Sequence, residues 1–260
     1  MPRVSCVFAL GCCWIFTVSG CGPSPAPPAA TASPSDDSAA SEKPSEDASP
    51  AVPEPIPMKP AAPRWTALFD GQSLEGWEPS NFGGEGEVTV EEGAIEMEMG
   101  ADLTGIHTDR ELPKTNYEVA LEARRVEGGD FFCGLTFPVG DDSCSLIVGG
   151  WGGGVCGLSS IDDRDASEND TTTYRGFETG QWYRVRLRVT GPRIQAWLDD
   201  ERIVNQPLEG KKISIRQEVD PSRPFGVCSW RTTAALRDIR IRELSREEVE
   251  RDAAEAKEES

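Results

Sequence analysis

Apolar and polar residues alternate along several short stretches in the middle of the chain. In Tyr117–Arg124, one side would carry Tyr117, Val119, Leu121 and Ala123, and the other Glu118, Glu122 and Arg124. The same period of two recurs in Trp182–Val189, Arg193–Leu198 and Leu236–Leu244. Each of these stretches predicts a strand with one buried face.

The spacing of glycines separates these strands, and no stretch before residue 245 carries an apolar stripe of three helical turns. We therefore expect an all-β sandwich of two packed antiparallel sheets, most simply a jelly roll. One face of each sheet forms the core. The other face, where Glu122 and the arginines point, is open to water or to a ligand.

The start of the chain has a different pattern. A basic residue, Arg3, precedes an apolar run from Val4 to Val18, and Ser19-Gly20-Cys21 follows. The run is about 15 residues, shorter than the ~20 that span a bilayer, which disfavours a transmembrane anchor. Residues 1–20 are predicted to be a lipoprotein signal peptide and Cys21 the lipidation site, so the protein would be exported and anchored by its lipid at the outer membrane or on the periplasmic side.

The rest of the chain divides by composition. Residues 21–63 are mainly Pro, Ala, Ser, Glu and Asp without aromatic residues, which predicts a disordered, lipid-anchored linker. Residues 64–244 contain the predicted strands and are long enough for one domain with a substantial core. Residues 245–260 predict an acidic C-terminal helix or a frayed tail.

The formal net charge of −19 is spread over all of these parts. Because phosphates would be repelled, the charge argues against nucleic acid as a partner and against binding to anionic lipid through charge. Neutral or cationic partners remain.

Four cysteines fall in the predicted domain: Cys133, Cys144, Cys156 and Cys228. An even number allows one or two disulfides in an oxidising compartment, with a pairing that the sequence leaves open. Their spacings of 11 and 12 residues between the first three match no zinc ribbon. Buried thiols or a disulfide are favoured over metal ligands.

Three segments taken together resemble the 3-keto-disaccharide hydrolase domain family: Leu68–Trp77, Asn116–Glu122 and Leu236–Arg242. The resemblance extends from Trp65 to Leu244 in the family's order and spacing. It implies a concanavalin-like jelly roll. It also implies cleavage of 3-keto-glycosides, or hydration of the resulting 3-keto-2-hydroxyglucal, by abstraction of the C2 proton.

That chemistry needs a base, an electrophile or divalent metal at the C3 oxygen, and an acid for the leaving group. Glu122 matches a family carboxylate, His107 is the one histidine of the chain, and Arg124 could steady an oxyanion. These three are the candidate catalytic residues. The alternatives are a cross-strand ion pair for Glu122 and Arg124 and a structural role for His107.

A dense acidic loop, Asp162–Glu168, supplies candidates for binding. Asp163 and Arg164 are expected to contact substrate, and Asp163 and Asp165 to hold a divalent metal through oxygen ligands. The alternative is a solvated connection.

Trp151 stands among glycines that would leave its ring bare, and Trp230 is a second candidate surface for stacking a sugar. The alternative for Trp151 is a ring that plugs a glycine-lined bend.

The chain departs from the family pattern at Gly128–Gly134, in the insert Cys144–Thr173 and at Phe225–Trp230. Two polar positions of the family are unfilled as a result. The leading hypothesis is an exported carbohydrate-active domain of the 3-keto-glycoside hydrolase or lyase type. The alternatives are a non-catalytic glycan-binding module of the cell envelope and a structural lipoprotein without a ligand.

Overall fold

The structure is a computed structural model that describes residues 64–258. In chain order its strands are β1 (Thr66–Ala67), β2 (Glu78–Pro79), β3 (Val88–Glu91), β4 (Ala94–Met97), β5 (Leu103–Thr108), β6 (Tyr117–Gly128), β7 (Cys133–Val139), β8 (Asp142–Gly150), β9 (Val155–Ser159), β10 (Thr173–Tyr174), β11 (Tyr183–Val189), β12 (Arg193–Leu198), β13 (Glu201–Pro207), β14 (Phe225–Trp230) and β15 (Thr232–Glu243). A 3-10 helix, η1 (Gln217–Ser222), precedes β14, and helix α1 (Arg246–Glu258) follows β15.

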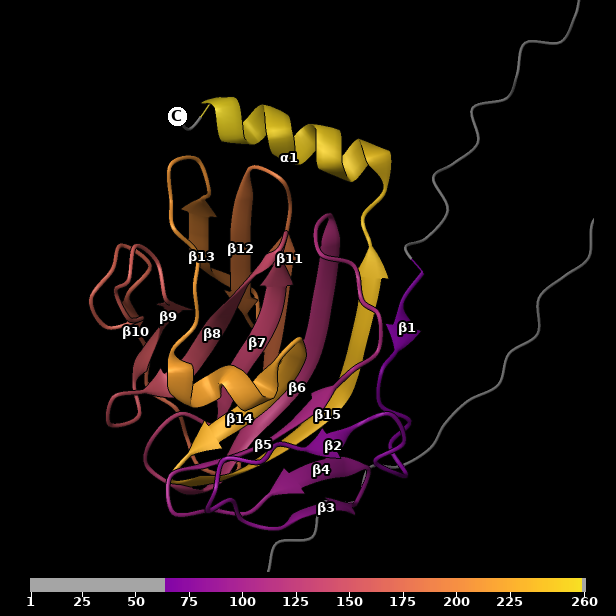
Figure 1. The fold of residues 1–260 in the computed structure, drawn as a ribbon, viewed down its shortest axis with the longest axis vertical. Helices are drawn as coiled ribbons and strands as arrows, with labels where there is room; N and C mark the ends of the chain where they lie inside the picture. The colour runs from indigo at the N-terminus through magenta and orange to yellow at the C-terminus, as the bar shows by residue number, and fades with distance from the viewer. Residues whose placement is uncertain (1–63, 259–260) are drawn as a thin grey trace, which may run out of the picture. The chain divides into compact units, whose positions relative to one another are not determined.

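These strands form two antiparallel sheets. Sheet A has the order β13-β12-β11-β6-β15-β4-β3, with β1 paired to β15, and sheet B has the order β10-β9-β8-β7-β14-β5-β2. Hairpins such as β8-β9 alternate with pairings of strands far apart in sequence, such as β6 with β15 and β7 with β14, as in a jelly roll. The expected all-β sandwich of two sheets is confirmed. Figure 1 shows α1 across one end of sheet A.

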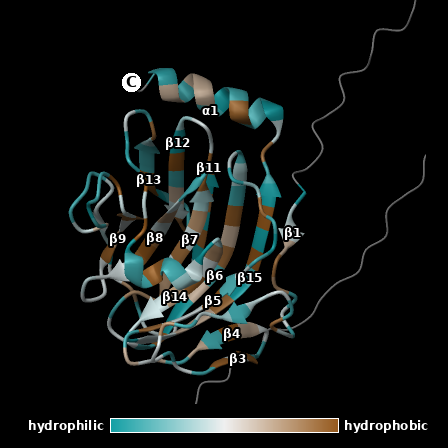
Figure 2. Ribbon diagram, viewed as in Figure 1, coloured by the Kyte–Doolittle hydropathy of each residue, from teal (hydrophilic) through white to brown (hydrophobic). Residues whose placement is uncertain are grey.

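The core lies between the sheets and follows the predicted alternation. Tyr117, Val119, Leu121 and Ala123 of β6 are at most 2% exposed, and Tyr183, Val185, Leu187 and Val189 of β11 are buried beside them. Figure 2 shows the resulting bands of hydrophobic and hydrophilic residues along these strands. Val185 and Leu187 face Leu121 and Val119 in the register of the two strands, so their side chains share the core face.

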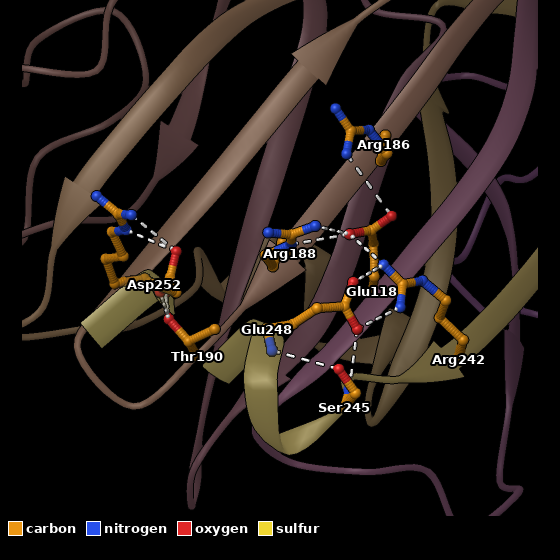
Figure 3. A network of polar contacts seen from close by, with 9 residues as sticks. Glu118, Arg186, Arg188, Thr190, Arg242, Ser245, Glu248 and Asp252 are labelled. Atoms are coloured by element: carbon orange, nitrogen blue, oxygen red, sulfur yellow. Dashed lines mark hydrogen bonds and ion pairs between the residues drawn. The ribbon is translucent and has the colours of Figure 1, made fainter. Parts of the chain in front are cut away.

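The outer face of sheet A is covered by ion pairs. Glu118 is 2% exposed and accepts hydrogen bonds from Arg188 at 2.8 Å and from Arg242 at 3.2 Å, with Arg186 3.7 Å away. Figure 3 shows this carboxylate surrounded by the three guanidinium groups. A buried carboxylate without such partners would carry a large desolvation penalty.

Helix α1 attaches to this face through charged residues. Asp252, 2% exposed, accepts hydrogen bonds from Thr190 and from Arg193, whose Nε lies 2.9 Å from its Oδ1. Nearer the start of the helix, Glu248 binds both Nη atoms of Arg242 (Figure 3). The C-terminal segment is therefore a docked helix, although it has hardly any apolar face.

The four domain cysteines are free and buried. Cys133 and Cys156 both lie opposite Val148, from strands on either side of β8, so their Cα atoms are about 10 Å apart, too far for a disulfide. Cys228 lies on the other face of sheet B, in the apolar cluster of Leu103 and Val219. Burial raises the pKa of Cys156 to about 11 and that of Cys144 and Cys228 to about 12, which keeps these thiols protonated and unreactive.

The signal peptide (1–20), the lipidation site Cys21 and the linker (21–63) lie outside the described residues. Within residues 64–258, none of the helices has the length and apolar character needed to cross a bilayer.

We predict that Asp252→Ala lowers the free energy of unfolding by about 3–5 kcal/mol, because it leaves the Arg193 guanidinium buried without its central partner. Urea unfolding measures the change. The control is Glu250→Ala on the same helix, which removes an exposed pair with Arg246 and should cost less than about 1 kcal/mol. Equal effects for the two variants would contradict a docked helix.

The Glu248–Arg242 pair predicts an acid-sensitive contribution to stability. Hydrogen bonds from Arg242 lower the pKa of Glu248 from 4.5 to about 2. The contribution should be complete above pH 4.5 and lost as the pH falls from there towards 2. Urea midpoints of the unchanged protein and of Glu248→Gln should therefore differ at pH 7 and converge near pH 2. A pH-independent difference would refute the assignment.

Candidate functional site

A cavity of about 270 Å³ opens on the outer face of sheet B, away from the core. Its floor is formed by side chains that point outward from three strands of sheet B: Leu103 of β5, Ser145 and Ile147 of β8, and Ser159 of β9. The walls come from the turn before β7, the turn after β8, the end of β14 and the segment around η1. The site is therefore built on rigid strands and bounded by turns.

Three aromatic residues form one wall: Phe131, Trp151 and Trp230. Trp151 is 44% exposed and has a positive φ of 49°, in a turn flanked by Gly150 and Gly152. The backbone N–H of Trp230 donates to the carbonyl of Phe131 at 3.0 Å, which holds the two main-chain segments that carry these rings together. The exposed indole of Trp151 is suited to stacking on the apolar face of a sugar ring. Trp230 is half-buried, and the guanidinium of Arg231 lies 5.4 Å from the centroid of its ring.

The opposite wall is polar. The guanidinium of Arg216 binds Glu218 through Nη2 at 2.8 Å and through Nε at 3.4 Å, and its Nη1 binds Asp165. Asp165 also accepts a hydrogen bond of 3.2 Å from Ser159 on the cavity floor. Arg216 and Glu218 line the cavity, and Asp165 holds Arg216 in place from behind.

These pairs also set the charge states in the cavity. The hydrogen bonds from Arg216 lower the pKa of Glu218, and the same contact raises the pKa of Arg216. Glu218 is therefore a carboxylate at neutral pH. An ionised carboxylate beside a fixed guanidinium can bind sugar hydroxyls or accept a proton.

Arg125 joins the two turns that carry Phe131 and Trp151. It is 6% exposed, and its Nη2 donates to the carbonyls of Asp130 at 3.0 Å, Gly153 at 3.2 Å and Gly149 at 3.3 Å. The Asp130 carboxylate adds a direct link, because it accepts the N–H groups of Phe131 at 2.8 Å and Gly152 at 3.0 Å. The aromatic wall is thus fixed from below by one buried guanidinium.

Two glycines let the covering elements lie close to sheet B. A Cβ at Gly134 would stand 2.9 Å from the Phe131 ring, and one at Gly226 would stand 2.6 Å from the Ser222 carbonyl at the end of η1. Both distances are too short for any other residue. These glycines therefore shape the wall of the cavity.

The structure brings together Trp151 and Trp230, the two tryptophans predicted to stack on a sugar. Trp151 lies in the turn after β8 and Trp230 is the last residue of β14, and their separation along the chain gave no indication that they line one cavity.

Glu122 and Arg124 do not line this cavity, and their catalytic role stays a prediction from the sequence. Both point outward from β6 of sheet A, on the opposite side of the core. Arg237 donates to Glu122 at 2.6 Å, and Arg124 stacks over Trp182 at 4.7 Å. The cross-strand ion pair, considered as the alternative for Glu122, describes its contact.

His107 also lies apart from the residues that line the cavity. Its Nδ1 is 3.1 Å from the Oγ of Ser80, which is fully buried. Because the Ser80 hydroxyl is buried, this contact ties the His107 ring to the interior of the protein. It agrees with the structural role considered as the alternative for His107.

The residues of the acidic loop, Asp162–Glu168, make contacts in different places. Asp163 pairs with Lys212 at 2.8 Å, and Arg164 lines a separate polar cavity of about 230 Å³ with Asp162 and Lys211. Of the predicted loop residues, Asp165 alone contacts the aromatic-lined cavity, through Arg216. Since Asp163 and Asp165 are each engaged by a cation, and no three acidic, His or Cys side chains in residues 64–258 gather as metal ligands, this donor set does not fit a bound divalent metal.

Sequence reasoning missed Arg216, Glu218, Asp130 and Arg125. Residues 209–224 contain no hydrophobic period, so nothing in that segment marked the first two. A signal for Arg125 did exist, because the alternation along β6 assigns position 125 to the core face, and a charged residue there requires buried partners.

Comparison with known proteins gives a family match over the whole described domain. The model of the 3-keto-alpha-glucoside-1,2-lyase-like domain family matches residues 64–242. A comparison with curated proteins gives no match.

Several solved structures are similar at low identity. A protein from Parabacteroides distasonis, inferred to be a glycosyl hydrolase, is 14% identical over 70% of this chain and 94% of its own, with a TM-score of 0.44. Carbohydrate binding module CBM66 from Bacillus subtilis is 13% identical over 65% and 96%, with a TM-score of 0.45. Crh5 transglycosylase in complex with NAG is 14% identical over 70% and 84%, with a TM-score of 0.48. Likenesses at this level carry no functional information.

We predict that Arg125→Leu loosens both turns of the aromatic wall, because three carbonyls lose their donor. Amide hydrogen exchange should become faster in peptides covering residues 128–132 and 149–154, and the free energy of unfolding should fall by about 2–4 kcal/mol. Arg124→Leu, on the outer face of sheet A, is the control and should leave exchange in both turns unchanged. Unaltered exchange in Arg125→Leu would exclude the proposed connection.

Proposed function

The chain belongs to the 3-keto-alpha-glucoside-1,2-lyase-like domain family, and from that membership we propose that the cavity on sheet B binds a 3-keto sugar and that Glu218 removes its C2 proton. The family membership supports carbohydrate as the ligand class. The more specific part of the proposal is the reaction, a cleavage or hydration of 3-keto sugars.

One observation carries it: two tryptophans and an ionised Glu218 paired with Arg216 line the same cavity. The rings supply a stacking surface for a sugar, and the ion pair supplies groups that can act on it. Glu122, the carboxylate predicted from the sequence to be catalytic, lies on sheet A and is bound by Arg237.

The chemistry requires little beyond these groups. The ketone at C3 makes the C2 proton acidic, so a carboxylate can take that proton while the electron pair of the C2–H bond moves towards the C3 oxygen. When the carbonyl re-forms, a double bond forms between C1 and C2, and the substituent at C1 leaves with the electrons of its bond. A proton from solvent or from a protein acid completes the departure.

Arg216 would stabilise the negative charge on the C3 oxygen. A guanidinium has five N–H donors, and the contacts with Glu218 and Asp165 use Nε, Nη1 and Nη2 once each. Two N–H groups, one on each Nη, are left for an oxygen of the ligand. Asp165 keeps the group oriented when Glu218 takes up its proton.

A second candidate function is a glycan-binding module without catalysis. The feature that favours it is the engagement of Asp130, the other carboxylate lining the cavity: its two oxygens accept backbone N–H groups, so it is not free to act as the acid. In this case Trp151 and Trp230 hold the glycan, and the Arg216–Glu218 pair binds its hydroxyls.

Export and anchoring through a lipid on Cys21 remain predictions from the sequence. Together with the domain function, they describe a carbohydrate-active lipoprotein of the cell envelope that acts outside the cytoplasm.

The test is turnover of a 3-keto-glucoside by the purified protein, followed by the release of the C1 substituent, with and without EDTA. We expect turnover by the unchanged protein, and a loss of about a hundredfold or more in Glu218→Gln, which keeps the shape of the side chain but cannot accept the proton. The matched control, Glu209→Gln, changes an exposed carboxylate outside the cavity and should retain full activity.

Absence of turnover under all divalent metals tried would reject the enzymatic proposal. Glycan binding that survives Glu218→Gln and disappears in Trp151→Ala would then favour the binding module. Unchanged binding in Trp151→Ala would count against both functions at this cavity.

A further inference from the structure

We propose that Tyr174 is a second stacking platform and that the ligand is an oligosaccharide chain, which leaves the cavity past Trp151 and passes over the glycine turn to Tyr174. This inference rests on the proposed function and names the ligand class of the same site.

The pairing of three strands places Tyr174 beside the cavity. Gly150 of β8 lies opposite Val155 of β9, and Val155 lies opposite Tyr174 of β10. Residues that are directly opposite each other point to the same face of a sheet, and two strand spacings correspond to about 10 Å. Tyr174 therefore stands on the outer face of sheet B, two strands from the residue before Trp151.

The exposure of Tyr174 is unusual for this protein. Among residues 64–258, the exposed large hydrophobic side chains are Met99, Trp151 and Tyr174, at 41%, 44% and 77%. Two of these three, Trp151 and Tyr174, lie on the side of the cavity where β8, β9 and β10 pair, and both are aromatic. Aromatic rings left in water next to a cavity mark a binding surface more often than scattered exposed residues do.

The turn that leads from Trp151 to β9 is low. It is made of Gly152, Gly153 and Gly154, and an added Cβ at Gly152 would meet no atom within 4 Å. The N–H groups of Gly153 and Gly154 both donate to the carbonyl of Gly150 at 3.1 Å, and Arg175 N–H donates to the carbonyl of Gly154 at 2.9 Å. The turn is thus fixed in shape, without side chains that would obstruct a chain of sugars.

The acidic loop blocks the direct route across β9. Ala166 is fully buried and packs on Ile147 and Val155. A Cβ at Gly157 would lie 3.1 Å from the Ala166 carbonyl, which shows how closely the loop covers this strand. A ligand that reaches Tyr174 must therefore pass on the side of the glycine turn, where Trp151 is exposed.

This arrangement sets a minimum ligand length. The backbones of Gly150 and Tyr174 are about two strand spacings apart, which exceeds the length of one pyranose ring, so a ligand that lies along this span has more than one sugar unit. Further units are needed to reach Tyr174, so affinity should grow with chain length beyond the unit held in the cavity.

The test uses α- and β-1,4-linked gluco-oligosaccharides of one to five units, oxidised at C3 of the terminal unit, with affinity measured by calorimetry on Glu218→Gln to prevent turnover. We expect affinity to rise between two and four units. Adding Tyr174→Ala should remove about fivefold in affinity for the longer chains and leave the affinity for one unit unchanged.

Two further variants serve as controls. Tyr174→Phe keeps the ring and should restore the affinity for long chains. Met99→Ala removes another exposed large side chain that does not line the cavity, and it should change nothing. Because Tyr174 is exposed, the urea midpoint of Tyr174→Ala should match that of the parent protein.

The outcomes separate the two proposals. Binding of one unit that depends on Trp151, without a gain for longer chains or without an effect of Tyr174→Ala, would overturn the extended platform and leave the cavity's function standing. Failure of all chain lengths to bind would overturn both.

Discussion

Successive side chains of a β-strand point to opposite faces of the sheet. Each side chain that packs between the two sheets therefore places its two neighbours in the strand on an outer face. Along β6, burial of Val119 and Leu121 leaves Glu118 and Glu122 on the outer face of sheet A. The protein meets this constraint differently on its two sides. Arginines, tryptophans and helix α1 cover the outer face of sheet A, whereas turns and η1 cover sheet B incompletely and leave a cavity. The difference between the two coverings decides which outer face carries the aromatic-lined cavity.

The fold could be predicted because this constraint acts locally. The alternation in Tyr117–Arg124 and Trp182–Val189 is sufficient to predict strands with one buried face, and β6 and β11 contain these residues with that pattern. The alternation does not say which of the two outer faces remains open. The alternation correctly placed Glu122 on an outer face, and from the sequence that face was expected to be open to a ligand. In the structure this is the outer face of sheet A, where Arg237 binds Glu122.

The residues of the cavity were predictable only in part. Trp151 among its glycines was a visible signal, because a large ring beside residues without side chains has little to bury it. Arg216 and Glu218 lie in a segment without periodicity, and their position depends on Gly226, which lets η1 approach the sheet. Such contacts join residues far apart in the chain, so they exist only after the strands have paired.

The strand pairing that separates Cys133 from Cys156 also affects how the protein folds and whether it can refold after unfolding. The native fold contains no covalent cross-link among its described cysteines, so it can be reached without an oxidant or an isomerase. The opposite holds once the chain has unfolded. In an oxidising medium four thiols become exposed at once, and every bridge that they form with one another is non-native. Unfolding is then irreversible until these non-native disulfides are reduced.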